Sequence, residues 1–200
     1  MSSRMHGSEE ALATFGVRRL APPKLVEAQQ GRGTLAAPCV LVGGLGMGFT
    51  LRAALDLLPL DATVVVAELL PAVVEWNRGP LGPLAAHPLN DRRVQVVEGD
   101  VGATMRASTA RFDAILLDVD NGPSALTSST NTDLYSDRGI AAAKVSLRPS
   151  GTLAVWSSRE DRKFEQRLRY RGFEVAVERV RGRLKQGGPR HVIFVGHTGA

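Results

Sequence analysis

Two carboxylates, separated by one residue, follow an apolar segment in the stretch "FDAILLDVDNGP". Asp118 comes directly after residues 112–117, and Asp120 comes directly before the turn residues Asn121 and Gly122. Acids at such a position can bind a cationic group or accept the proton of an attacking amine. They can equally cap a turn, because Asp and Asn accept local backbone hydrogen bonds and Asn-Gly is a common turn pair. The choice between these interpretations depends on the other residues at the same edge of the fold.

A glycine-rich turn and a further acid could hold a nucleoside. Gly44, Gly46 and Gly48 separate an apolar segment from a helix-like one. Glycine permits a tight turn and a close approach of the backbone to a ligand, and the following helix presents its N–H groups. Glu68 ends the next apolar segment, 20 residues after Gly48. At that spacing a carboxylate can accept hydrogen bonds from two ribose hydroxyls, although a plain surface glutamate is the alternative.

The residues that follow the second and third apolar segments suit an adenine ring. Leu69 and Leu70 come after Glu68 and offer an apolar face. Asp100 ends the stretch "VQVVEGD", where it could accept a hydrogen bond from the adenine amino group, with Val101 beside it. Asp100 also suits the first position of a helix, where its side chain would cap backbone N–H groups. The two roles are compatible.

Apolar runs that alternate with helix-like segments predict the elements that position these residues. The predicted strands are 39–44, 62–68, 94–100, 112–118, 152–158, 173–180 and 190–196, and the predicted helices are 49–58, 71–79, 132–147 and 160–172. Continuous Val/Ile/Leu strands between helices indicate a parallel sheet that is covered on both faces. A short Gly-Pro loop joins the last two strands, so the final strand runs antiparallel. We therefore predict an α/β fold: a doubly wound, mostly parallel, seven-stranded sheet of the Rossmann-like AdoMet-methyltransferase type with a C-terminal antiparallel hairpin.

In such a sheet the first four strands bring their carboxyl ends to one edge. Ligands bind there, beyond the ends of the strands. The glycine turn, Glu68, Asp100 and Asp118 occupy these four ends, which predicts an adenosine-type ligand. A nicotinamide dinucleotide is a minor alternative, because it needs no acids at the third and fourth strand ends.

Composition limits the class of protein. The chain has 200 residues, 44% hydrophobic and 22% charged, which suits one soluble globular domain. No apolar run approaches the roughly 20 residues that cross a bilayer, and the N-terminus has no apolar signal core, so a cytoplasmic protein without a membrane partner is expected. Cys39 is the single cysteine, which excludes an internal disulfide. The four histidines show no metal-ligand spacing, and no metal is expected.

The positive charge is concentrated near the C-terminus. Residues 159–190 carry 11 Lys/Arg against 5 Asp/Glu, a balance of +6, while the whole chain has a net charge of +5. Such a segment can bind nucleic acid, or it can be a solvated helix face and a loop. Aromatic residues make up only 5% of the chain, so base stacking has little support, and a nucleic-acid partner is not expected.

Ordered motifs in the sequence resemble the spermidine synthase family of polyamine aminopropyltransferases. The matching stretches, within residues 39–180, are "GGLGMGFTLR", "VVVAELLPAVVEWNR", "RRVQVVEGD", "FDAILLDVDNGP", "LYS" and "GTLAVWS". The resemblance implies transfer of an aminopropyl group from decarboxylated AdoMet to a small-molecule amine, with methylthioadenosine as product. It implies that the turn 44–48 and Glu68 bind the nucleoside, that Asp100 contacts adenine and that Asp118 is the catalytic acid.

Two features depart from that family. The family usually reads Asp-x-x-Asp-Pro, whereas Asp118 and Asp120 are closer together here. Its N-terminal Tyr-His-Glu element has only residues 8–10, "SEE", at the nearest position. The family also carries an N-terminal β-rich domain that helps to form oligomers. We expect residues 1–38 to be an N-terminal segment, the remnant of a lost or truncated β-rich domain, and residues 39–200 to be the nucleoside-binding transferase domain.

Other functions remain open on the same fold. A methyltransferase that uses intact AdoMet on a small molecule would explain the irregular acid spacing. A non-catalytic nucleoside-binding or oligomerising module would explain the short N-terminal segment, and a homodimer is compatible with the sequence. In that segment we expect a helix at 8–15 capped by Ser8 and another at 22–31.

Overall fold

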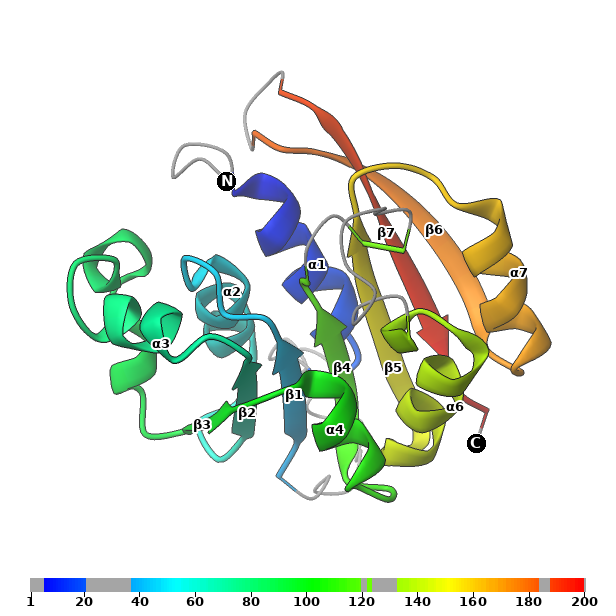
Figure 1. The fold of residues 1–200 in the computed structure, drawn as a ribbon, viewed down its shortest axis with the longest axis horizontal. Coiled ribbons are helices and arrows are strands. Elements are labelled where there is room, and N and C mark those ends of the chain that lie inside the picture. The colour runs from blue at the N-terminus through cyan, green and yellow to red at the C-terminus, as the bar shows by residue number, and fades with distance from the viewer. Residues whose placement is uncertain (1–5, 21–36, 120–121, 124–132, 184–187, 200) are drawn as a thin grey trace, which may run out of the picture.

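A seven-stranded sheet with the strand order β3-β2-β1-β4-β5-β7-β6 forms the centre of the molecule (Figure 1). The computed structural model describes residues 6–20, 37–119, 122–123, 133–183 and 188–199. The strands are β1 Cys39–Gly43, β2 Thr63–Glu68, β3 Val94–Glu98, β4 Phe112–Leu117, β5 Leu147–Ser157, β6 Glu174–Arg181 and β7 Arg190–His197. Strands β1 to β5 pair in parallel, and β7 runs antiparallel between β5 and β6. The predicted fold class is confirmed.

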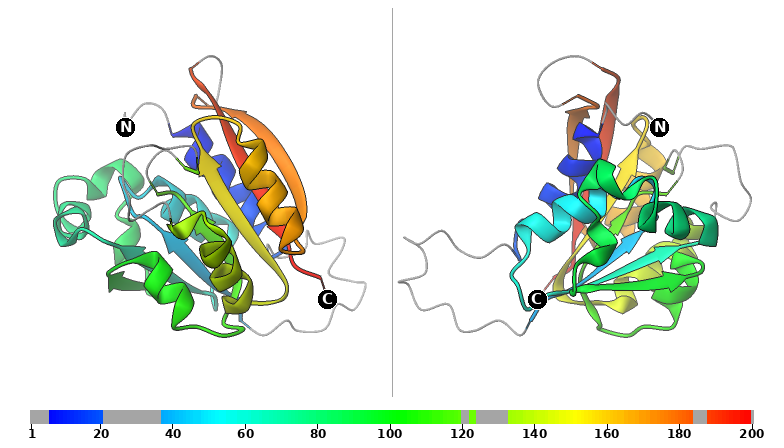
Figure 2. Two further views of the ribbon diagram at one scale, coloured as in Figure 1. Left: turned by 45° about the vertical axis from the view of Figure 1, so that its right-hand side comes forward. Right: turned by 90° about the vertical axis from the view of Figure 1, so that its left-hand side faces the viewer.

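Helices cover both faces of this sheet (Figure 2). They are α1 Gly7–Val17, α2 Phe49–Leu57, α3 Pro71–Arg78, α4 Val101–Arg106, α6 Asp137–Ser146 and α7 Arg162–Tyr170, with short 3-10 turns at η2 Gly82–Ala85 and η3 Pro88–Asn90. One core lies between the sheet and α4, α6 and α7. The second core lies between the opposite face and α1, α2 and α3. The sheet is therefore doubly wound, as predicted.

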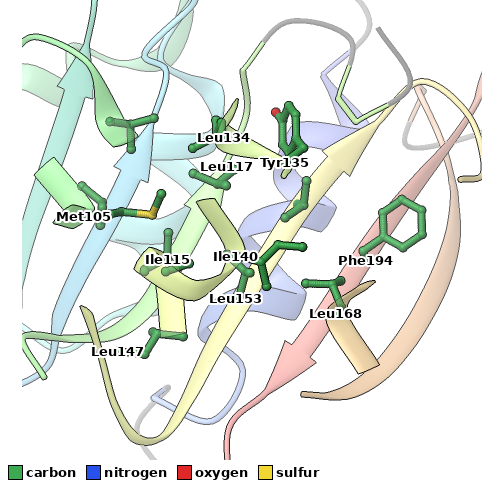
Figure 3. Packing of buried hydrophobic residues seen from close by; sticks show 14 of the residues in the cluster. Met105, Ile115, Leu117, Leu134, Tyr135, Ile140, Leu147, Leu153, Leu168 and Phe194 are labelled. Atoms are coloured by element: carbon green, nitrogen blue, oxygen red, sulfur yellow. The ribbon is translucent and has the colours of Figure 1, made fainter. Parts of the chain in front are cut away.

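Strand β4 shows why the central strands consist almost entirely of apolar residues. Ala114 and Leu116 face the core with α1 and α2. Ile115 and Leu117 face the other core, where Figure 3 shows them beside Met105 and beneath helix α6. Neighbouring residues of a strand point to opposite faces. A strand that is covered on both sides therefore needs an apolar residue at every position.

Strand β5 starts earlier than the sequence predicted, at Leu147 instead of Thr152. The pairing with β4 shifts between the pair Phe112–Leu147 and the pair Ala114–Thr152, so residues 148–151 are an irregular insertion. Proline is tolerated at such a bulge because no ladder hydrogen bond is lost. Pro149 therefore lies inside β5, which begins directly after helix α6.

Two helix starts also differ from the prediction. Helix α6 begins at Asp137, because the Ser136 hydroxyl caps it by accepting hydrogen bonds from the N–H groups of Arg138 and Gly139. Helix α1 begins at Gly7, so the prediction that Ser8 caps this helix is wrong. The Ser8 hydroxyl lies instead 2.8 Å from Nδ1 of His191 in β7. The helix expected at 22–31 lies outside the described residues.

Within the described ranges, no helix is long and apolar enough to span a membrane. No group of three or more His, Cys, Asp or Glu side chains in this part of the chain could hold a metal ion.

Candidate active site

The turn after β1 requires glycine at two positions. Gly44 and Gly48 have φ angles of 86° and 83°, in the left-handed region that favours glycine. A Cβ on Gly44 would lie 2.5 Å from the carbonyl oxygen of Asp118, which follows β4. The Asp118 N–H in turn donates to the Gly43 carbonyl at 2.9 Å. The predicted glycine turn and the predicted catalytic acid are therefore neighbours.

Glu68 supports this turn from the end of β2. Its side chain is 8% exposed. Its two oxygens accept hydrogen bonds from the Leu45 N–H at 2.9 Å and from the Leu70 N–H at 3.0 Å. Each carboxylate oxygen keeps a second lone pair that could accept a hydrogen bond from a hydroxyl group. Leu69 and Leu70 beyond it are exposed, at 59% and 57%, and so leave an apolar surface at the edge of the sheet.

Asp100 reaches the same edge, where it caps helix α4. Its oxygens accept hydrogen bonds from the N–H groups of Gly102 and Ala103 at 3.0 and 2.9 Å. Arg106 lies 3.2 Å from the same carboxylate. The neighbouring Val101 is buried and packs against Gly43 at the end of β1. The capping interpretation is therefore correct, and the contact with adenine stays a prediction.

The carboxylate of Asp118 lies in a partly buried position beside helix α2. Its Oδ2 accepts a hydrogen bond from the Thr50 hydroxyl at 2.6 Å. Burial raises the pKa of Asp118 to about 6, with a smaller raising effect from the Glu9 carboxylate and an opposing effect from Thr50. An acid with this pKa can both bind a cation and exchange a proton near neutral pH. Asp120 lies outside the described residues, so its role stays a prediction.

Asn77 holds the glycine turn from helix α3. Its Nδ2 donates to the carbonyl oxygens of Gly46 and Val73 at 2.8 and 2.9 Å, and the residue is 1% exposed. Its Oδ1 has no hydrogen-bond partner among the described residues. This oxygen would lie 3.0 Å from a Cβ at Gly48. Asn77 is thus buried directly behind the predicted ligand-binding turn.

The first turn of α1 forms the far side of the site. Figure 1 shows its N-terminal end above the carboxyl ends of the strands, near the start of β7. Ser8 is fully buried and its hydroxyl is 2.8 Å from Nδ1 of His191. The His191 ring packs edge-on against Trp156, with 4.7 Å between the ring centroids. Ser8, His191 and Trp156 therefore form a packed group of polar and aromatic side chains on the sheet face that α1 covers.

Three of these residues, Thr50, Asn77 and His191, have no local sequence signal that points to a site. Thr50 and Asn77 lie in ordinary helical segments, and His191 lies in a strand without metal-ligand spacing. The contact between Ser8 and His191 joins residues 183 positions apart, and no local pattern can indicate such a pairing.

No protein-family profile matches the chain, and no curated protein matches it by sequence. Among solved structures, a spermidine synthase in complex with the transition-state analogue AdoDATO matches with a TM-score of 0.72 and 19% identity over 96% of this chain and 60% of that chain. The spermidine synthase of Thermotoga maritima matches with a TM-score of 0.68 and 18% identity over 96% of this chain and 58% of its own. This chain thus spans about three fifths of the length of these synthases.

A methyltransferase shows the same architecture. The precorrin-6y C5,15-methyltransferase of Geobacter metallireducens matches with a TM-score of 0.58 and 18% identity over 82% of each chain. These likenesses establish that the chain has the class I AdoMet-dependent methyltransferase fold, which the spermidine synthases share.

Proposed function

We propose that this chain transfers an aminopropyl group from decarboxylated AdoMet to a small-molecule amine. The observation that carries the proposal is the position of Asp118: a carboxylate with a raised pKa, hydrogen-bonded to Thr50 and adjacent to the glycine turn. The sequence motifs support it, and so does the fold shared with spermidine synthases.

The residues around the turn fit the nucleoside half of this co-substrate. A Cβ at Gly44 would collide with the Asp118 carbonyl oxygen and one at Gly48 with Pro88, so only glycine lets this turn pack tightly at the end of β1. Glu68 lies behind the turn with lone pairs left for the two ribose hydroxyls. Leu69, Asp100 and Val101 would then contact adenine.

Asp118 would act on the amine. Alkylamines are protonated near neutral pH, since their pKa is close to the lysine value of about 10. Asp118 binds the ammonium, and its raised pKa makes it a better proton acceptor than an ordinary aspartate. The neutral nitrogen forms a bond to the carbon beside the sulfonium, the carbon–sulfur bond breaks, and its electron pair stays on sulfur as the neutral thioether. Asp120 would pair with a second cationic group of the acceptor.

The direct test is product formation. The protein is mixed with decarboxylated AdoMet and putrescine, and methylthioadenosine and the aminopropylated amine are measured by mass spectrometry. We expect both products from the wild type and at least a hundredfold slower turnover from Asp118→Asn, because general acid–base catalysis typically contributes about 10² to 10⁴. If a protein that binds methylthioadenosine yields no product with any of several diamines, the proposal is wrong.

Methyl transfer from intact AdoMet is the second candidate. It is favoured by the precorrin methyltransferase likeness, which spans 82% of both chains, whereas this chain spans only 60% of the first synthase. Thermal unfolding with each co-substrate separates the two. Aminopropyl transfer predicts that decarboxylated AdoMet raises the Tm more than AdoMet does, and methyl transfer predicts the reverse. A protein that binds either compound but transfers neither group would be a nucleoside-binding module.

A further inference from the structure

Ser8, Glu9 and His191 form a hydrogen-bond chain between helix α1 and strand β7. The Ser8 hydroxyl donates to Oε2 of Glu9 at 2.7 Å. The same hydroxyl lies 2.8 Å from Nδ1 of His191. Ser8 is fully buried, whereas Glu9 and His191 are half-buried.

The direction of these bonds determines which nitrogen of His191 carries the proton. A hydroxyl has one hydrogen, and a carboxylate oxygen can only accept. Because Ser8 gives its hydrogen to Glu9, Nδ1 of His191 must be the donor to the Ser8 oxygen. Nδ1 is then protonated in the neutral ring, and Nε2 keeps a lone pair. Burial lowers the pKa of His191, which favours this neutral form at pH 7.

The lone pair on Nε2 accepts no hydrogen bond from the residues that the structure describes. In the described part of the chain, the only hydrogen bond of this ring is the one at Nδ1. The indole Nε1 of Trp156, whose ring packs against His191, is likewise buried without a hydrogen-bond partner among these residues. An acceptor beside an aromatic ring and a nearby carboxylate suits an ammonium or another positively charged N–H group.

The sheet places this acceptor on the same side as the proposed reaction centre. Asp118 follows Leu117, which pairs with Val155 of β5, and Trp156 of β5 pairs with Ile193 of β7. His191 lies two residues from Ile193 and therefore shares its face, toward α1. Strands β4 and β7 are two strand spacings apart, about 10 Å. The Glu9 carboxylate is near enough to both groups for its charge to raise the pKa of Asp118 and of His191.

We infer that His191, held by Ser8 and Glu9, is a specificity-determining residue that accepts a hydrogen bond from the distal amino group of a diamine whose other nitrogen lies at Asp118. The inference rests on the proposed function for the identity of the reacting end. It assigns to the acceptor a second N–H group that extends from the end of β4 across β5 toward β7.

Acceptor selectivity tests this role. The kcat/KM for putrescine and for butylamine, which lacks the second amino group, is measured for the wild type and for His191→Phe. We expect the wild type to prefer putrescine and the variant to lose about tenfold to a hundredfold of that preference, as for one hydrogen bond to a charged group. The value for putrescine should fall by more than the value for butylamine. His197→Phe is the matched control, because His197 is on the same strand and bonds to Thr152 at the opposite end. A variant that keeps the wild-type preference overturns the inference.

Imidazole ¹⁵N NMR gives a readout that needs no turnover. With ¹⁵N-labelled histidine, and with His191 assigned from the spectrum of His191→Phe, we expect Nε2 to be unprotonated at pH 7 and to shift when putrescine is added with methylthioadenosine. Ser8→Ala, which removes only a hydroxyl, should abolish the tautomer preference. A protonated Nε2 in the wild type, or no response to putrescine, overturns the inference. A shift of the Nε2 signal without any turnover would support the role of His191 in binding and reject the proposed reaction. Turnover with unchanged selectivity in His191→Phe would support the reaction and reject the role of His191.

Discussion

At the scale of single residues, Asp118 has an environment that favours its protonated form. A carboxylate that is placed only for stability normally gains charge-stabilising partners, which lower its pKa. Burial beside Thr50 has the contrary effect here and raises the pKa to about 6. A group that costs stability at neutral pH and lies at a convergence of strand ends is typical of a functional site.

The cost of the Asp118 charge should be measurable. Between about pH 4 and pH 6 the folded protein binds a proton at Asp118 that the unfolded chain releases, so this group makes stability fall as the pH rises through that window. Asp118→Asn keeps an acceptor for Thr50 but carries no charge. We expect the variant to be more stable than the wild type at pH 8, by on the order of 2 kcal/mol, and equally stable near pH 4. Urea unfolding at both pH values measures this, and a variant that is less stable at pH 8 contradicts it.

Asn77 should affect ligand binding through the turn that it holds. Asn77→Ala removes both hydrogen bonds of Nδ2 and leaves the Gly46 carbonyl without its side-chain partner. We expect a loss of about 1 to 3 kcal/mol of stability, the usual cost of an unsatisfied buried group, and about tenfold weaker binding of methylthioadenosine. Isothermal titration at a temperature where both proteins are folded provides the measurement. The exposed Asn90→Ala is the control. Unchanged affinity would show that Asn77 serves stability alone.

At the scale of elements, the sequence predicted the central strands well because they are buried on both faces. Every residue of β1 after Cys39 is buried, and such runs differ clearly from the amphipathic helices between them. The errors have tertiary causes. The early start of β5 follows from its pairing with β4 at Phe112. The position of Ser8 inside helix α1 follows from a partner on β7.

Arg93 joins the end of helix α2 to the start of strand β3. Its Nη1 donates to the carbonyl oxygens of Leu58 and Pro59, and its Nε and Nη2 donate to the two oxygens of Asp91. The hydrogen bonds from Arg93 to the Asp91 carboxylate lower the pKa of Asp91 to about 2. Carbonyl groups at a helix end have no partner within the helix, so Arg93 supplies what the backbone lacks.

Replacing Arg93 should therefore destabilise the fold without touching the site. We expect Arg93→Met to lose about 3 kcal/mol at pH 7, because it leaves a partly buried carboxylate without its partner. Asp91 contributes its stability above its ordinary pKa of 3.8, and that contribution is lost as the pH falls toward 2. The difference in unfolding free energy between wild type and Arg93→Met, measured by urea unfolding, should therefore become smaller as the pH is lowered from about 4 toward 2. Arg93→Lys keeps the positive charge but cannot form the two parallel hydrogen bonds, so its stability should be intermediate between those of wild type and Arg93→Met. Equal stability of Arg93→Met and wild type at pH 7 would refute this role.

At the scale of the whole molecule, the parallel strands made it predictable that the glycine turn, Glu68, Asp100 and Asp118 lie at one edge of the sheet, because the carboxyl ends of parallel strands meet there. The binding of a nucleoside by these residues stays a prediction. The contact between α1 and β7 could not be predicted, because it depends on how segments far apart in the sequence pack. The positive charge near the C-terminus is partly neutralised by ion pairs of Arg169, Arg171 and Arg179 with acidic residues, which supports a solvated face.

The central claim is that adenosine lies across this edge with its ribose on Glu68. Its most direct test measures, by isothermal titration, the affinity for methylthioadenosine and for its 2′-deoxy analogue, in the wild type and in Glu68→Gln. We predict that removal of the hydroxyl weakens binding to the wild type by about tenfold or more and has little further effect in the variant, because hydrogen bonds to a charged group are worth about 1.5 to 3 kcal/mol. The claim is contradicted if the wild type binds neither compound, or if the hydroxyl contributes equally in both proteins.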